Sequence, residues 1–135
     1  MSTLRLEIVT PQATAFSEDV DMVTLPAIEG QIGVYPLHVR LITQIVPGEL
    51  TVTKNGADRL LAVGEGMVEI TPDRVSIVTD MAIAAEHIDE AKVEEARARA
   101  AARLREKISD EEVASVNASL ARSLAQLQVK RRRRM

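Results

Sequence analysis

Two histidines are the first candidates for acid–base chemistry, because this chain of 135 residues contains no cysteine. His38 and His87 are far apart in the sequence, and neither belongs to a grouping of Asp, Ser or Cys that would make a nucleophilic or proton-transfer site. We therefore expect structural or interface roles for both histidines, and the sequence predicts no catalytic residue.

The carboxylates and glycines offer no stronger site. The chain has 20 Asp and Glu residues, but none shows the spacing of a general acid–base pair or of a metal site. The glycine-containing segments 30–33 and 64–66 are not phosphate loops, since neither precedes a Lys-Ser or Lys-Thr pair at the start of a helix. We predict a protein that is not an enzyme and that binds no metal and no cofactor.

Five consecutive basic residues at positions 130–134 form the densest charge cluster. Such a cluster can meet an acidic protein surface, nucleic acid or anionic lipid, or it can be a frayed and solvated tail. Nucleic acid is the weakest of these options, because charges of both signs alternate before the cluster and no aromatic residue lies nearby to stack on bases. We expect no nucleic-acid partner.

The two parts of the chain differ in charge. Residues 1–87 carry five Lys or Arg and twelve Asp or Glu, a net charge of −7, whereas residues 88–135 carry twelve and eight, a net charge of +4. This asymmetry predicts two modules with different partners, with their boundary between residues 87 and 88. No apolar run approaches the roughly 20 residues that span a bilayer, and the alternating N-terminus does not resemble a signal peptide.

The acidic module has the pattern of β-strands. Apolar residues alternate in 4–8, and short β-rich runs follow at 20–25, 50–53, 59–63, 67–70 and 75–78. We expect Pro11 and Pro26 to end strands and Asn55-Gly56 to form a hairpin turn. Gly64 and Gly66 predict a bulge or a close approach of two backbones. Many short strands indicate an all-β sandwich or barrel.

The basic module has the pattern of two helices. Asp89 is suited to cap the first, which we expect to end near Lys107, and Ser109 with Glu112 forms a capping box for the second. The expected apolar stripes are Val93, Ala96, Ala100, Leu104 and Ile108, then Val113, Val116, Leu120, Leu124 and Leu127. The short connection makes the helices antiparallel, and the alanine-rich seam buries little area. We therefore expect a hairpin that needs a supporting surface and can leave it.

Several cations on the first helix could hold a polyanion such as a nucleotide. The alternative is a capped helix with a salt-bridged surface, including Glu95 and Arg99 at a spacing of four residues. From the residues alone we favour the salt-bridged surface.

Three segments of the chain follow the residue pattern of one protein family. Residues 27–50 read AIEGQIGVYPLHVRLITQIVPGEL, residues 61–78 read LAVGEGMVEITPDRVSIV, and residues 85–92 read AEHIDEAK. In this order they resemble the epsilon subunit of F-type ATP synthases, with similarity from about Leu4 to about Leu127. The resemblance implies a two-domain β plus α fold, in which a β-sandwich of about ten short strands precedes an antiparallel two-helix hairpin.

The resemblance also implies a function. Members of this family are non-catalytic central-stalk subunits that couple proton-driven rotation to ATP synthesis. They bind the gamma subunit and the c-subunit ring, and the extended hairpin reaches the alpha/beta catalytic head and can inhibit ATP hydrolysis there. The implied location is peripheral, on the cytoplasmic face of a bacterial plasma membrane or on an equivalent energy-transducing membrane, with membrane contact only through the complex.

Departures from the family pattern are expected to alter individual contacts. Gln31 stands where the family usually has Glu, so we expect the contact to the c ring to lose a charge. Leu37 replaces Gly and Arg40 replaces a small residue or Pro, so we expect that loop to differ in conformation or in local partner. Lys92 replaces the Arg of a motif through which some members bind ATP, which predicts weak or no ATP binding.

The residues that the resemblance assigns fall into two groups. The remaining ATP candidates are Asp89, Lys92, Arg99 and Arg122, and the interface candidates are Glu29, Gln31, His38, Arg40, Arg131 and Arg132.

Overall fold

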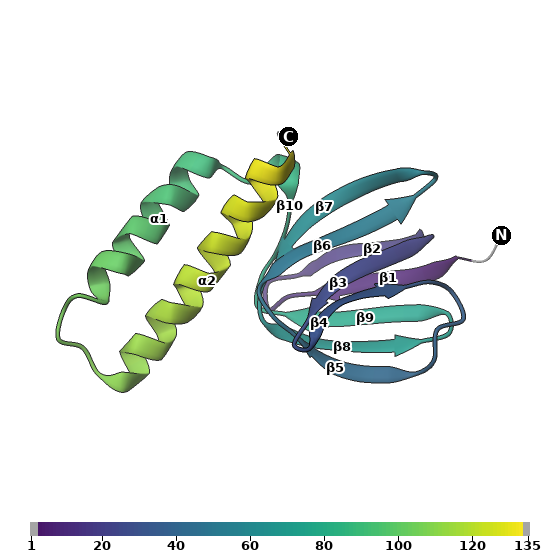
Figure 1. Cartoon of the computed structure of the whole chain (residues 1–135), viewed down its shortest axis with the longest axis horizontal. Helices are drawn as coiled ribbons and strands as arrows, with labels where there is room; N and C mark the ends of the chain where they lie inside the picture. Colours follow the sequence, from purple (N-terminus) through teal and green to yellow (C-terminus); the bar gives the residue numbers. More distant parts are fainter. Residues whose placement is uncertain (1–2, 134–135) are drawn as a thin grey trace.

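The computed structural model of the chain describes residues 3–133 and shows a β-sandwich with a helical hairpin at one end (Figure 1). The strands are β1 Leu4–Val9, β2 Thr14–Val20, β3 Met22–Ala27, β4 Gly30–Val34, β5 Leu41–Ile45, β6 Gly48–Lys54, β7 Ala57–Val63, β8 Gly66–Thr71, β9 Arg74–Thr79 and β10 Ala82–Ala84. The short 3-10 helix η1 Ala85–His87 leads to α1 Glu90–Arg103 and α2 Asp110–Arg133. The expected fold class is confirmed.

The strands form one continuous hydrogen-bonded path that bends around the core. Its order is β10-β7-β6-β3-β5-β8-β9-β1-β2, with β4 paired to β3 beside this path. All pairs are antiparallel except β1 with β9. The core is aliphatic and comes from the alternating positions of the strands, as in β1, where Leu4, Leu6 and Ile8 are buried.

Two expectations about strand ends are wrong. Residues 20–25 belong to two strands, because β2 ends at Val20 and β3 begins at Met22. The corner between them is held by Asp21, whose N–H donates to the Thr53 carbonyl at 2.9 Å and whose carboxylate accepts from the Asn55 N–H at 2.8 Å. Pro26 does not end β3, since its carbonyl accepts from the Val46 N–H at 2.9 Å and the strand continues without a donor from proline.

The predictions for turns and glycines are confirmed. Asn55 and Gly56 have φ angles of 53° and 77°, the left-handed conformation of a tight hairpin between β6 and β7. A Cβ atom at Gly66 would lie 2.0 Å from the Val78 carbonyl oxygen, and one at Gly64 would lie 1.8 Å from Asp80 Oδ1. At Gly66 the obstacle is backbone, so this close approach of β8 and β9 requires glycine, whereas at Gly64 the obstacle is a side-chain oxygen.

The helix starts agree with the sequence, but one helix end does not. Asp89 caps α1 by accepting from the Lys92 N–H at 3.2 Å, and Ser109 caps α2 by accepting from the Glu112 N–H at 3.2 Å. However, α1 ends at Arg103, not near Lys107. The guanidinium of Arg103 contacts both Glu106 and Glu112, at 2.6 Å in the second case, and these contacts favour a turn over another helical turn.

The apolar stripe predicted for α2 is partly wrong. Leu127 is buried as expected, but the Leu124 side chain is 49% exposed. Ala125 and Val129 are buried in addition. The reason is that α2 packs against α1 along its length and also against the sandwich near its C-terminus, so its buried surface does not follow a single helical face.

Candidate functional site

The C-terminal part of α2 rests on the edge of the sandwich formed by β6, β7 and η1 (Figure 1). A second apolar cluster, separate from the sandwich core, forms this docking seam. It contains Ala62, Ala85, Ile88, Val93, Leu127 and Val129, with Leu60, Met81 and Ile83 packed against it. Because two of the nine are alanines and three others are only partly buried, the seam buries a small apolar area.

Two ion pairs bracket the docking seam. Arg122 Nη1 lies 3.1 Å from Asp80 Oδ2 at one end, and Arg132 contacts Glu49 at the other. Ten residues of helix separate the two arginines, which corresponds to about 15 Å along the axis. The hairpin is therefore fixed to the sandwich by charged contacts on both sides of an apolar centre.

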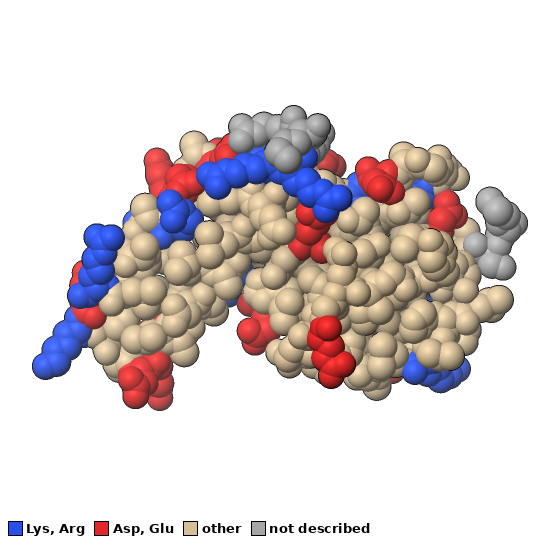
Figure 2. Space-filling model, viewed as in Figure 1, with Lys and Arg blue, Asp and Glu red and all other residues tan. Residues whose placement is uncertain are grey.

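The basic residues 130–132 contact three different elements. Lys130 Nζ donates to the Ala85 carbonyl at 3.2 Å, and Arg131 donates to Glu90 at 3.1 Å and Glu94 at 3.0 Å. A frayed tail is therefore the wrong interpretation for these residues; positions 134 and 135 lie outside the described residues. Figure 2 shows basic side chains gathered on the hairpin and at its junction with the sandwich, which is mostly uncharged in this view.

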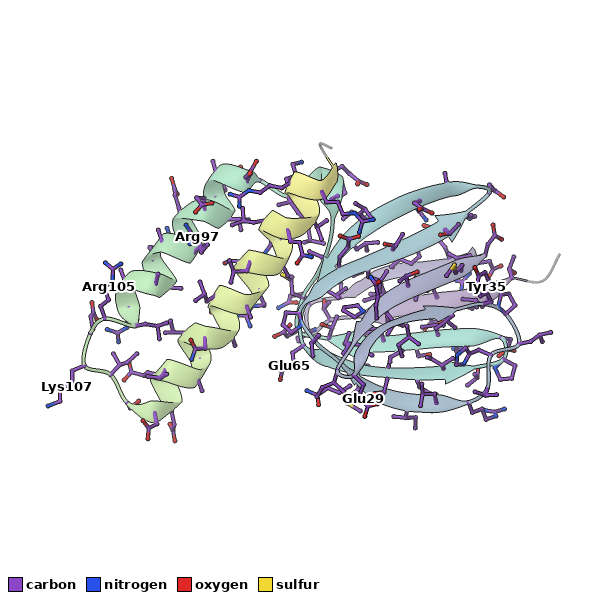
Figure 3. The ribbon with its side chains drawn as sticks, viewed as in Figure 1. Glu29, Tyr35, Glu65, Arg97, Arg105 and Lys107 are labelled. Atoms are coloured by element: carbon purple, nitrogen blue, oxygen red, sulfur yellow. The ribbon has the colours of Figure 1, made fainter. Side chains whose placement is uncertain are left out.

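The interface candidates of the sandwich lie at its two opposite ends. Glu29 and Gln31 are at the end that faces the hairpin, where Gln31 and Arg132 line the same pocket. His38 and Arg40 belong to the loop between β4 and β5, at the other end, where Figure 3 labels Tyr35. These four residues therefore do not form one continuous surface.

The loop with His38 also carries exposed apolar side chains. Leu37 is 79% exposed, and Tyr35 and Val39 are exposed as well. Leu37 has a φ of 70°, the left-handed conformation that glycine adopts most easily, and its N–H donates to the Pro72 carbonyl at 2.7 Å. The replacement of glycine by Leu37 is thus compatible with a left-handed backbone here, and what it adds is an apolar side chain in solvent.

An apolar row crosses the outer face of the sandwich, which the sequence analysis missed. Met67 on β8 is paired with Val78 on β9, and Val78 is paired with Val9 on β1. Met67 and Val78 are 49% and 62% exposed, and Ile42 on β5 is exposed on the neighbouring strand. We call Val9, Ile42, Met67 and Val78 the outer row. Adjacent apolar pairs such as Ile77-Val78 were the available signal, since they place one apolar side chain on each face.

The ATP candidates are not gathered into one site. Asp89 is used as the cap of α1, and Arg122 is paired with Asp80 and also donates to Ser119 at 3.0 Å. Lys92 and Arg99 are exposed on α1. Among the described residues, the ion pair on this helix joins Glu94 to Arg97, not the expected Glu95 to Arg99. The hydrogen bond from Arg97 lowers the pKa of Glu94, with further contributions from Arg131.

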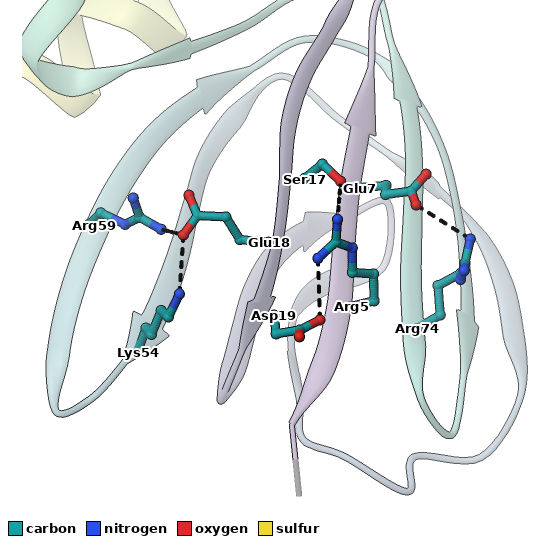
Figure 4. Close-up of polar contacts among 8 residues, drawn as sticks. All are labelled: Arg5, Glu7, Ser17, Glu18, Asp19, Lys54, Arg59 and Arg74. Carbon is teal, nitrogen blue, oxygen red and sulfur yellow. Dashed lines mark hydrogen bonds and ion pairs between the residues drawn. The ribbon is translucent and has the colours of Figure 1, made fainter.

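The sandwich carries its own ion pairs on β2 and its neighbours (Figure 4). Glu18 Oε1 accepts from Arg59 at 3.0 Å and from Lys54 at 3.3 Å. Arg59 lies over the Phe16 ring, 5.1 Å from its centre. The hydrogen bond from Arg59 holds the pKa of Glu18 below its ordinary value.

Two kinds of site are absent from the described part of the chain. No group of three or more His, Asp or Glu residues within 3–133 could hold a metal ion. Over the same range, no helix has both the length and the apolar character needed to cross a membrane.

Two family models match consecutive parts of the chain. Residues 3–85 match the beta-sandwich domain of the ATP synthase Delta/Epsilon chain, and residues 86–131 match its long alpha-helix domain. The ATP synthase epsilon chain of Herpetosiphon aurantiacus is 41% identical over 97% of this chain and 96% of its own length. That of Chloroflexus aggregans is 40% identical over 93% and 91%.

Solved structures share the fold. A chain of the Euglena gracilis mitochondrial ATP synthase, in a structure of OSCP, F1 and c-ring, superposes with a TM-score of 0.77 at 22% identity, covering 95% of this chain and 81% of that chain. A chain from the central stalk and c-ring of the Tetrahymena thermophila mitochondrial ATP synthase gives a TM-score of 0.55 at 9% identity, with 98% and 96% covered. At these identities the similarity concerns the fold alone.

Proposed function

Because the chain belongs to the ATP synthase delta/epsilon chain family, as an epsilon chain, we propose that it is a non-catalytic central-stalk subunit of an F-type ATP synthase. The observation that carries this proposal is the match of both family domains, in order, to the sandwich and to the helices. In this role the chain turns with the rotor and helps to couple proton flow to ATP synthesis. It reaches the cytoplasmic side of the membrane through the complex.

The proposed partner of the outer row is the gamma subunit. Four exposed apolar side chains on adjacent strands form a surface that a partner protein can cover with a gain from apolar burial. Their strands are rigid parts of the sandwich, so this surface is preformed. The hairpin lies against other strands, β6 and β7, and leaves this face open.

The proposed second partner of the sandwich is the c-subunit ring. The two groups of candidates, Glu29 with Gln31 and His38 with Arg40, lie at opposite ends of the domain, and a crosslinking experiment can distinguish them. The chain has no cysteine, so a single cysteine at Gln31 or at His38 gives an unambiguous crosslink. If neither position crosslinks to a ring subunit in the assembled synthase, the proposed contact is wrong.

We propose that the hairpin regulates ATP hydrolysis by leaving the sandwich and extending toward the alpha/beta head. The support is the small apolar seam and the charged contacts of Arg122 and Arg132, which fix the hairpin to the sandwich through the C-terminal half of α2.

Two experiments test the proposal. Purification of the synthase through a tag on this chain should recover gamma, alpha, beta and the c ring. Truncation of the chain after residue 88 should leave assembly intact and raise the ATPase rate. An intact synthase purified without this chain would refute the stalk role, whereas unchanged ATPase activity would refute only the inhibitory role.

A further inference from the structure

Three consecutive basic side chains at the end of α2 point in three directions. Successive residues of an α-helix are rotated by about 100°, so Lys130, Arg131 and Arg132 face different neighbours. Lys130 meets η1, Arg131 meets α1, and Arg132 meets β6. All three find a partner because the sandwich, the linker and the first helix surround this end of α2.

The contact of Arg132 is the most buried of the three. Its partner Glu49 has a side chain that is only 5% exposed. Among the described residues, the other contact of Glu49 is a hydrogen bond of 3.4 Å from the Thr51 hydroxyl, which carries no charge. Since a buried carboxylate that loses its cation is strongly destabilised, removal of Arg132 should disfavour the docked arrangement.

Arg131 adds a connection between the two helices. It joins Glu90 and Glu94 in the first turns of α1 to the end of α2, while Lys130 donates to the carbonyl of Ala85 next to the linker. Positive charge at the C-terminus of α2 is also favoured by the helix dipole. The three contacts thus stabilise the hairpin and its docking at the same place.

We infer that Lys130, Arg131 and Arg132 form a clasp that holds the hairpin against the sandwich and sets the balance between the docked and the released hairpin. The inference rests on the proposed mobility of the hairpin. The apolar seam is small, so the charged contacts carry a large share of the docking free energy. Salt should then favour release, because these side chains are only partly shielded from solvent.

The test uses the isolated full-length chain with two dyes, attached to cysteines that replace Ala57 in the sandwich and Ala114 on α2. Both positions are exposed and lie outside the clasp. Energy transfer between the dyes reports the docked fraction. The clasp variant combines Arg131→Gln with Arg132→Gln, and the matched control combines Arg105→Gln with Lys107→Gln, which removes the same charge from the hairpin tip (Figure 3).

The clasp variant should shift the equilibrium toward release by at least about tenfold, as expected when a buried carboxylate loses its cation. It should also lose part of the salt dependence seen in the unmodified chain, since the ion pair of Arg122 with Asp80 remains. The control should change neither the docked fraction nor the salt dependence. The charge exchange Glu49→Arg with Arg132→Glu should recover docking relative to Arg132→Glu alone. Equal docked fractions and equal salt responses in clasp variant and control would overturn the clasp.

Circular dichroism and hydrogen exchange of the sandwich separate release from unfolding. The inference is supported if energy transfer falls in the clasp variant while the amides of its sandwich stay protected from hydrogen exchange. A clasp variant that stays docked refutes it. The proposed stalk role is tested separately, because binding to gamma does not enter these measurements.

Discussion

At the scale of single residues, Glu18 shows how a surface carboxylate contributes to the fold. Its pKa is lower in the folded chain because Arg59 and Lys54 donate hydrogen bonds to it (Figure 4). These contacts therefore stabilise the fold above the ordinary Glu pKa of about 4.3. The contribution is lost as the pH falls through the lower pKa of the folded chain.

We predict that Glu18→Gln lowers the free energy of unfolding by about 0.5–1 kcal/mol at neutral pH, the range of partly exposed ion pairs. The difference from the unmodified chain should be smaller at about pH 3 than at neutral pH, because the Glu18 carboxylate loses charge as the pH falls toward its lowered pKa. Urea unfolding at both pH values measures this. Glu69→Gln, an exposed change on β8, is the control, and an equal difference at both pH values would contradict the ion-pair explanation.

Gly66 tests the close approach of β8 and β9. We predict that Gly66→Ala lowers the free energy of unfolding by about 2 kcal/mol, because its Cβ would meet a backbone oxygen at 2.0 Å. The matched control is Gly33→Ala, whose Cβ would meet only the flexible end of Met22 at 2.9 Å and should cost much less. Equal costs for the two changes, measured by urea unfolding, would show that the strands move apart easily.

Arg122 bears on nucleotide binding. Its guanidinium is held by Asp80, and Lys92 lacks the two-pronged hydrogen bonding of arginine, so we predict no micromolar binding of ATP. Calorimetry of the isolated chain with ATP measures this. A micromolar dissociation constant that disappears in Arg122→Gln would contradict the prediction.

Residue-scale features were predictable where one short segment determines them. The turn at Asn55-Gly56 and the helix caps Asp89 and Ser109 follow from local backbone conformation. The close approach at Gly66 follows because glycine has no side chain. The partners of Arg131 and Arg132 were not predictable, because they lie on elements distant in sequence whose positions depend on how α2 packs.

At the scale of elements, the sandwich and the hairpin have separate apolar clusters. Among the described residues, the buried side chains of the sandwich core all come from strand residues before position 78, whereas the docking seam includes helix residues. The period change near residue 88 predicted the two kinds of element. The exposure of Leu124 could not be predicted from this change of period, because periodicity does not say which side of α2 meets the sandwich in addition to α1.

We predict that the chain truncated after residue 88 still unfolds in one cooperative thermal transition. Its core remains complete, and only the sandwich side of the seam becomes exposed. Calorimetry of the truncated and full-length chains measures this. A broad, non-cooperative transition in the truncated chain would mean that the sandwich needs the hairpin.

At the scale of the whole molecule, the chain combines a rigid acidic sandwich with a basic hairpin held near one end. The overall family and fold were predictable because many weak motifs occur in one order along the chain. The outer row was not, since its residues come from four strands and become neighbours only through their pairing. Surfaces that assemble from distant strands need the structure.

The most direct test of the stalk role is binding of this chain to the gamma subunit of the same organism, measured by co-elution in size-exclusion chromatography. We predict a stable complex that is lost when Met67→Asp and Val78→Asp are combined in the outer row. Ala57→Asp, an exposed change far from the row, should leave it intact. No complex with the unmodified chain would contradict the proposed function, and a complex that tolerates both row changes would contradict the proposed docking surface.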